Sequence, residues 1–319
     1  MKLCLVSHSL VHPRQAIFAE ELRKQGIDLL EVYPFRWGSL SRAQGYSVHS
    51  EGSIFEFVFG DDAIKAIEQF KPDWIYVQDE PNSLVMYQMS SLAQRSKSKL
   101  AGFTWENIKK EYAFPFQDEA LRNCRLIVCG NSEAKKIMLT KNVDPSRLVV
   151  LPQVGVSTSM FCPQDVSKKI SVVCIGRMSP EKGGSFIREA YPDTTFVTNT
   201  PYEQLPEIFN SAKVSVQFSH SVPGWKEQAG NYVNLEAMSC ALPVVTSNCG
   251  AIPEFLEGSK AYMVKERDTD GLKRAIDELL LLNDDERRKL GLMNREFILQ
   301  RFSNEKVASK LVEALSCLS

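Results

Sequence analysis

Short apolar runs that alternate with amphipathic segments constrain this chain more than any other feature. Runs at residues 3–6, 74–77 and 126–129 are each followed by a polar loop and then by a segment whose apolar residues recur at helical spacing. A chain that alternates strand and helix in this way forms a mostly parallel sheet with helices on both faces. The alternation therefore predicts an α/β protein.

The chain of 319 residues is long enough for two such domains. Residues 152–164 are rich in structure breakers and lack periodicity, and the alternation resumes beyond them. We therefore expect one Rossmann-like domain over residues 1–160 and a second over 161–303, with a closing helix at 304–319. Residues 34–52 are polar and irregular, and we expect a loop there.

Polar side chains gather at the predicted carboxyl ends of the strands in the first half. In open parallel sheets this edge is where ligands bind. The residues are His8, Asp79, Glu80, Glu106, Asn107, Asn131 and Ser132.

Composition narrows the class of protein. A formal net charge of −1 argues against a nucleic-acid-binding surface over the whole molecule. The eight cysteines form no Cys-x-x-Cys pair, which favours free thiols in a reducing cytosol over a zinc site or disulfides. No apolar run is long enough for a signal peptide or a membrane span, so we expect a cytoplasmic protein that meets a membrane only at its surface.

The most informative stretch is a glycine-containing loop that leads into a helix. Gly230 and Asn231 permit a tight turn, and Asn231 is a suitable N-cap. The amides of Tyr232 and Val233 then begin a helix whose positive end suits a phosphate, with Glu236 on its inner face. An ordinary α/β unit with a polar loop is the alternative.

A second loop adds positive charge beside another helix start. Gly176 and Arg177 follow an apolar run, and Lys182 precedes a helix that begins near Gly183. A guanidinium, an ammonium and a helix N-terminus all carry positive charge, which stabilises the negative charge of a diphosphate leaving group. The alternative is a solvated basic loop.

Both loops resemble the signature of retaining, GT-B-fold glycosyltransferases of family four (glycosyl transferases group 1). The matching motifs are Glu236-Ala-Met, Pro243-Val-Val, Gly250-Ala-Ile-Pro-Glu254 and Gly176-Arg177 through Glu181-Lys182-Gly183. The resemblance implies two Rossmann-like α/β/α domains facing across a cleft, with the closing helix packed back on the first domain. It also implies that Arg177 and Lys182 bind the donor diphosphate and that Glu236 binds the ribose hydroxyls.

The chain departs from the family pattern at two places. The family carries a Glu eight residues before Glu236, where this chain has Gln228, with Glu227 one residue earlier. Either Gln228 or Glu227 is a candidate to take the place of that family glutamate. Many relatives also place a His at the strand end near Trp105, and here Glu106 or Asn107 takes the position in the cleft. With no obvious side chain as base, a phosphate oxygen of the donor is the expected proton acceptor.

The resemblance implies a retaining, metal-independent transferase without a further cofactor. It would move a sugar from a UDP- or GDP-linked donor to a hydroxyl of a glycan or lipid-linked acceptor, with the acceptor bound by the first domain. Two alternatives stay open. One is a catalytically silent protein that binds a nucleotide-sugar, prompted by the missing Glu. The other is a nucleotide-sugar epimerase of the same architecture.

Overall fold

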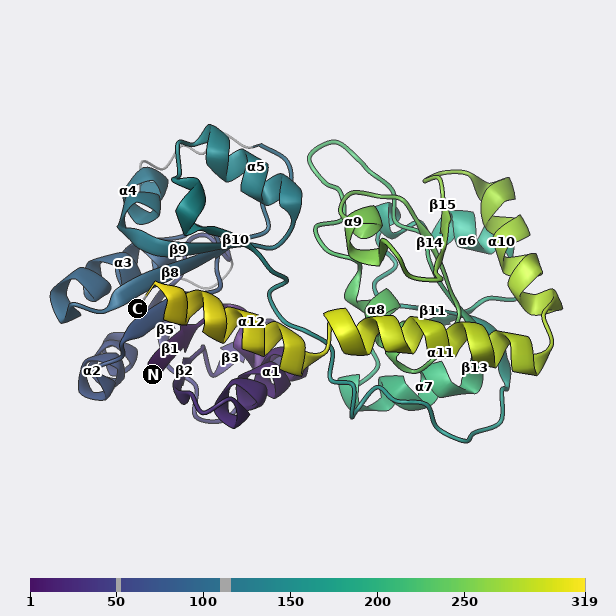
Figure 1. Cartoon of the computed structure of the whole chain (residues 1–319), viewed down its shortest axis with the longest axis horizontal. Coiled ribbons are helices and arrows are strands. Elements are labelled where there is room, and N and C mark those ends of the chain that lie inside the picture. Colours follow the sequence, from purple (N-terminus) through teal and green to yellow (C-terminus); the bar gives the residue numbers. More distant parts are fainter. Residues whose placement is uncertain (50–52, 110–115, 319) are drawn as a thin grey trace. The chain divides into compact units, whose positions relative to one another are not determined.

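A computed structural model describes residues 1–49, 53–109 and 116–318, which divide into two compact units (Figure 1). Unit 1 comprises Met1–Gly155 and Val307–Ser319, and unit 2 comprises Val156–Lys306. The sequence placed these boundaries at 160 and 303. Each unit is described by itself below.

Unit 1 is built on a six-stranded parallel sheet with the order β2-β1-β7-β8-β9-β10. All four residues of β7 are buried, as expected for a central parallel strand with helices over both faces. The strands are β1 (Lys2–Val6), β2 (Asp28–Val32), β7 (Trp74–Val77), β8 (Lys99–Thr104), β9 (Cys124–Cys129) and β10 (Leu148–Val150). The strand order changes direction between β1 and β7, which makes this the switch point of unit 1.

Helices connect these strands, and the last helix of the chain joins unit 1. Val307, Leu311 and Leu315 of that helix are buried. The helices are α1 (Pro13–Lys24), α2 (Asp61–Phe70), α3 (Leu84–Ser96), α4 (Phe116–Asn123), α5 (Ser132–Thr140) and α12 (Asn304–Cys317), with short 3₁₀ turns η1 (His8–Val11) and η2 (Pro145–Arg147). The N-cap side chains of α3 and α5, Ser83 and Asn131, accept backbone N–H groups of the first turn.

The stretch 34–52, expected as a loop, also contains three strands of two residues each. Strand β3 (Arg36–Trp37) pairs with β4 (Leu40–Ser41), and β5 (Val48–His49) pairs with β6 (Val58–Phe59), both antiparallel. Strands of two residues are too short to show an alternating pattern, so the sequence did not reveal them. Residues 50–52 lie outside the described part of the chain.

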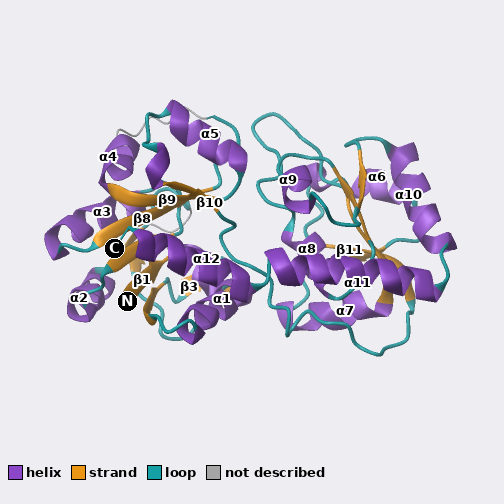
Figure 2. Ribbon diagram, in the orientation of Figure 1, coloured by secondary structure: helices purple, strands orange, loops and turns teal. Residues whose placement is uncertain are grey.

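Unit 2 has a five-stranded parallel sheet with the order β12-β11-β13-β14-β15. Figure 2 shows helices around its orange strands. The strands are β11 (Ile170–Ile175), β12 (Thr195–Val197), β13 (Ala212–Gln217), β14 (Val244–Ser247) and β15 (Tyr262–Val264). The helices are α6 (Gly184–Ala190), α7 (Leu205–Ser211), α8 (Tyr232–Ser239), α9 (Ile252–Leu256), α10 (Thr269–Leu281) and α11 (Asp284–Arg301), with 3₁₀ turns η3 (Pro180–Lys182) and η4 (Tyr202–Gln204).

The two sheets confirm the predicted α/β class with two Rossmann-like domains. In unit 2 the chain leaves β11 for β12 on one side and returns to β13 on the other, so its switch point lies between β11 and β13. The loops that follow these two strands carry most of the residues that the sequence singled out.

Candidate functional site

The first feature of the site is an ion pair at the switch point of unit 2. Lys182, at the end of η3, places its Nζ 2.6 Å from Oε1 of Glu227, which lies on the connection from β13 to α8. The same oxygen accepts the Ser219 hydroxyl at 2.5 Å. The Lys182 ammonium also lies 5.0 Å from the ring centroid of Trp225. Two loops that are 45 residues apart in sequence thus meet through one buried carboxylate.

A second turn holds the backbone of Glu227 in place. The Ala251 N–H donates to the Glu227 carbonyl oxygen at 2.9 Å. Gly250 has φ +57°, and a Cβ at this position would lie 2.1 Å from that oxygen. Only glycine combines this backbone conformation with so close an approach. The glycine of the Gly-Ala-Ile-Pro-Glu motif therefore positions Glu227.

The amino end of α8 adjoins the ion pair. Asn231 is the predicted N-cap, and its Oδ1 accepts the Val233 N–H at 3.3 Å. Its Nδ2 donates to Glu227 at 3.4 Å, and its φ of +55° is unusual for a residue other than glycine. A Cβ at Gly230 would meet the Phe255 side chain at 2.6 Å, so this position also requires glycine. The first turn at Tyr232 and Val233 supplies a helix N-terminus beside Lys182 and Glu227.

Glu236 lies deeper on the same helix. It is fully buried, and its Oε1 accepts the Tyr202 hydroxyl at 2.7 Å. Tyr202 belongs to η4, which follows β12. The sequence missed Tyr202 because its hydroxyl reaches Glu236 from a turn 34 residues earlier in the chain. It missed Ser219 although this residue lies on the same β13 to α8 connection as Glu227, because no recognised motif includes it.

Arg177 and Gln228 are exposed, unlike Lys182 and Glu227. Arg177 follows Gly176, whose φ of +131° suits glycine. A hydrogen bond from Ser179 lowers the pKa of the Glu181 carboxyl, and the charges of Arg177 and Lys182 lower it further. Arg177 and Lys182 therefore both influence the charge of Glu181 on the loop after β11. The exposure of Gln228 contrasts with the burial of Glu227.

The unit 1 candidates belong to a separate cluster. Glu106 is buried and pairs with Lys141, whose Nζ lies 2.5 Å from Oε2. Asn107 is also buried. Glu80 accepts the Thr104 hydroxyl at 2.7 Å and the Trp105 N–H at 2.8 Å. The carboxylates at the ends of β7 and β8 are thus engaged in local hydrogen bonds or an ion pair.

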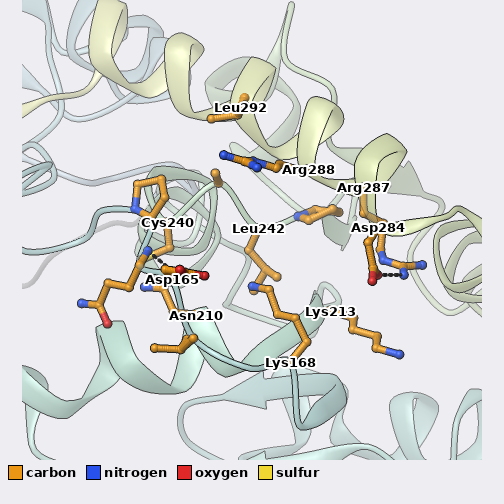
Figure 3. A pocket seen from close by; sticks show the side chains of 15 residues that line it. Asp165, Lys168, Asn210, Lys213, Cys240, Leu242, Asp284, Arg287, Arg288 and Leu292 are labelled. Carbon is orange, nitrogen blue, oxygen red and sulfur yellow. Dashed lines mark hydrogen bonds and ion pairs between the residues drawn. The ribbon is translucent and has the colours of Figure 1, made fainter.

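Unit 2 also contains a pocket of about 590 Å³ (Figure 3). Lys168 precedes β11, Lys213 lies at the start of β13, and Pro243 precedes β14. These residues mark the amino ends of the strands, whereas Lys182 and Glu227 follow carboxyl ends. The pocket therefore lies at the opposite edge of the sheet from the predicted donor residues.

Comparisons with known proteins bear on the family. A model described as glycosyl transferases group 1 matches residues 188–297. The match covers about a third of the chain. The matched segment contains Tyr202, Ser219, Glu227 and Glu236, and the Gly176 to Lys182 loop lies just before it.

Individual relatives of this chain are distant. It is 37% identical over 87 residues to N-acetyl-α-D-glucosaminyl L-malate synthase of Bacillus anthracis, which is 27% of this chain and 22% of that protein. It is 23% identical over 291 residues to the phosphatidylinositol N-acetylglucosaminyltransferase GPI3 subunit of Saccharomyces cerevisiae, covering 79% of this chain and 59% of that one. The chain thus spans less than two thirds of the length of either relative.

The fold has close counterparts among solved structures. Anabaena Alr3699/HepE in complex with UDP and glucose superposes with a TM-score of 0.74 over 99% of this chain and 100% of that one, at 14% identity. The two Rossmann-like units of this chain therefore have the GT-B fold. Across the described ranges, each helix is too short or too polar to cross a bilayer. The same ranges hold no group of three or more His, Cys, Asp or Glu side chains placed to bind a metal ion.

Proposed function

We propose that this chain transfers a glycosyl group, with retention of configuration and without a metal, from a UDP- or GDP-linked sugar to a hydroxyl of a glycan or lipid-linked acceptor. The observation that carries the proposal is the cluster of Lys182, Glu227 and the α8 N-terminus at the switch point of unit 2. Nucleotides bind at this edge of parallel sheets, where helix N-termini attract phosphate.

The donor diphosphate lies against Lys182, Arg177 and the first-turn amides of α8 in this proposal. When the bond from the anomeric carbon to the phosphate oxygen breaks, its electron pair leaves with the nucleoside diphosphate. The two cations and the amide groups stabilise the negative charge that develops there. Glu236, on the inner face of the same helix, binds the ribose hydroxyls.

Glu227, rather than Gln228, contacts the transferred sugar in this proposal. Its carboxylate is oriented by Lys182, Ser219 and Asn231, and its backbone is fixed by Ala251. The Gln228 side chain lies on the exposed side of the same loop. A carboxylate held by several partners presents a defined geometry to a sugar hydroxyl.

The test is release of nucleoside diphosphate from UDP-glucose, UDP-N-acetylglucosamine and GDP-mannose, with thermal stabilisation by each donor measured in parallel. We expect one donor to stabilise the protein and to be turned over, and Lys182→Ala to lower turnover about a hundredfold. Glu227→Ala should abolish turnover and Gln228→Ala should change it less than tenfold. Lys273→Ala, which removes an exposed lysine on α10, is the control.

Distinct outcomes would contradict each part. Donor binding without turnover in any reaction would favour the silent binding protein, and isomerised donor without acceptor would favour an epimerase. Loss of turnover in Gln228→Ala alone would transfer the sugar-contacting role to Gln228. A product of inverted configuration, read from its NMR coupling constants, would refute retention.

A further inference from the structure

The pocket at the amino edge of the unit 2 sheet lies entirely within that unit. Ile170 of β11 and Ala212 of β13 are register partners in neighbouring parallel strands. Lys168 lies two residues before Ile170 and Lys213 directly follows Ala212, so the two lysines enter the pocket from the same edge of the sheet. Figure 3 shows them on one side of the pocket and Arg288 of α11 on the other.

The lining of this pocket is positively charged. Four basic and two acidic side chains line it, which leaves a net charge of +2. A hollow lined mainly by one sign of charge focuses the electric field and concentrates ions of the opposite sign. The pocket therefore favours an anion. The charged residues are Lys168, Lys213, Arg287, Arg288, Asp165 and Asp284.

The two lysines have no carboxylate partner of their own. Within the described residues no hydrogen bond or ion pair engages the ammonium of Lys168 or Lys213. Asp284 is paired with Arg287, whose hydrogen bond and charge lower the pKa of the Asp284 carboxyl, and the charges of Lys213 and Lys168 lower that pKa further. Both lysines thus lie within electrostatic reach of one carboxylate that already has a partner, and their ammonium groups are available to a ligand.

The pocket is larger than a simple inorganic anion. Its volume of about 590 Å³ falls within the range of about 300–1,000 Å³ that small-molecule sites have. Leu242 and Pro243 are buried in its wall, and Val166 and Leu292, which are 37% and 45% exposed, border it. These apolar side chains provide a surface for an organic group beside the cations.

We propose that this pocket binds a small phosphate ester, with its phosphate against Lys168, Lys213 and Arg288 and its organic group against Leu242 and Leu292. A phosphate monoester carries a charge of about −1.5 to −2 at pH 7, which complements the net charge of the lining. Lysine and arginine both bind phosphate through charge-assisted hydrogen bonds. The site is additional to the proposed donor site at the carboxyl edge of the sheet, and it does not depend on whether the chain transfers a sugar.

Isothermal titration calorimetry with glycerol 3-phosphate and glucose 6-phosphate tests the proposal. Inorganic phosphate lacks the organic group, and glycerol lacks the phosphate. Each titration uses the wild-type protein and Lys182→Ala, because Lys182 belongs to the proposed donor site. We expect at least one ester to bind both proteins with the same Kd and about tenfold more tightly than inorganic phosphate does, whereas glycerol should not bind.

Substitutions in the pocket locate the bound ester. Lys168→Gln and Lys213→Gln each remove one charge at similar side-chain length and should raise the Kd of the ester about tenfold. Lys169→Gln is the matched control, because Lys169 is an exposed neighbour of Lys168 outside the lining of the pocket. It should leave the Kd within about twofold. The Tm of each variant without ligand shows that the protein is folded.

The results that would overturn the proposal differ from those that bear on the proposed function. Ester binding that is lost in Lys182→Ala but kept in Lys168→Gln and Lys213→Gln would place the phosphate at the donor site. Equal affinity for inorganic phosphate and both esters would remove the role of the organic group, and failure of both esters to bind the wild-type protein at millimolar concentration would refute the site. A protein that turns over no donor but binds an ester through Lys168 and Lys213 would refute the proposed function alone.

Discussion

Replacing Gly250 by alanine tests how the turn after β14 shapes the proposed donor site. The new Cβ would lie 2.1 Å from the Glu227 carbonyl oxygen, where ordinary contact begins at 3.4 Å. The loop must therefore move by about 1.3 Å (3.4 − 2.1), a distance that breaks the hydrogen bond from Ala251 to Glu227. The backbone at +57° adds a left-handed strain that glycine does not have.

The expected cost can be worked from these contacts. A left-handed alanine costs roughly 1–2 kcal/mol, the lost hydrogen bond about 1 kcal/mol, and the forced displacement of the backbone about 1–2 kcal/mol more. The free energy of unfolding of unit 2 should thus fall by about 3–5 kcal/mol. At about 2–4 °C per kcal/mol for a domain of this size, its Tm should fall by about 6–20 °C.

Gly26→Ala provides the matched control. Gly26 also has a left-handed φ, +80°, but a Cβ there would meet nothing within 4 Å. Its Tm shift in unit 1 should reflect strain alone, about 2–8 °C. Differential scanning calorimetry measures both shifts, and the stabilisation by donor should be lost only in Gly250→Ala because Glu227 and Lys182 move. Equal Tm shifts in the two variants, with donor stabilisation intact in both, would refute the reasoning.

Three further substitutions each test interactions within one of the two units. Burial raises the pKa of the Glu80 carboxyl to about 7 despite two hydrogen bonds that lower it, so the stabilising protonated form is fully present below pH 4.5 and is lost as pH rises through 7. The free energy of unfolding, measured with urea, should therefore fall by up to about 3 kcal/mol between pH 4.5 and pH 8, and Glu80→Gln should remove this pH dependence. A pH dependence that persists in the variant would exclude Glu80 as its source. Tyr202→Phe removes a hydroxyl donor from the buried Glu236 and should cost about 1–3 kcal/mol in denaturant unfolding, whereas a neutral effect would show that the pair contributes nothing to stability. Arg287 is buried, and its guanidinium donates to the last carbonyls of α10. Arg287→Ala should lower the free energy of unfolding by about 2–3 kcal/mol, whereas Arg288→Ala, at an exposed neighbour, should lower it by less than about 0.5 kcal/mol. Equal losses in the two variants would contradict the capping role of Arg287.

Local chemistry made much of the architecture predictable from sequence. Apolar runs of strand length, helical periodicity and N-cap residues such as Asn231 are encoded within a few neighbouring positions. For the same reason, the glycine and cation motifs marked the two loops that we propose bind the donor. Retention, the donor and the roles of Arg177, Gln228 and Asn107 stay predictions.

Pairings across the sheets could not be read from the sequence in the same way. His8 and Asp79 are 71 residues apart, Lys182 and Glu227 are 45 apart, and Tyr202 and Glu236 are 34 apart. Each pair meets only because of the order in which strands add to a sheet, which no local pattern records.

The sequence alone thus determined two α/β units and the loops proposed to bind the donor, since strand length, helical period and turn residues act over short distances. The tertiary structure decided which carboxylate pairs with which base, which of Glu227 and Gln228 is buried, and which histidine lies at a switch point. Those outcomes depend on strand order and register, properties of the whole sheet rather than of any one segment.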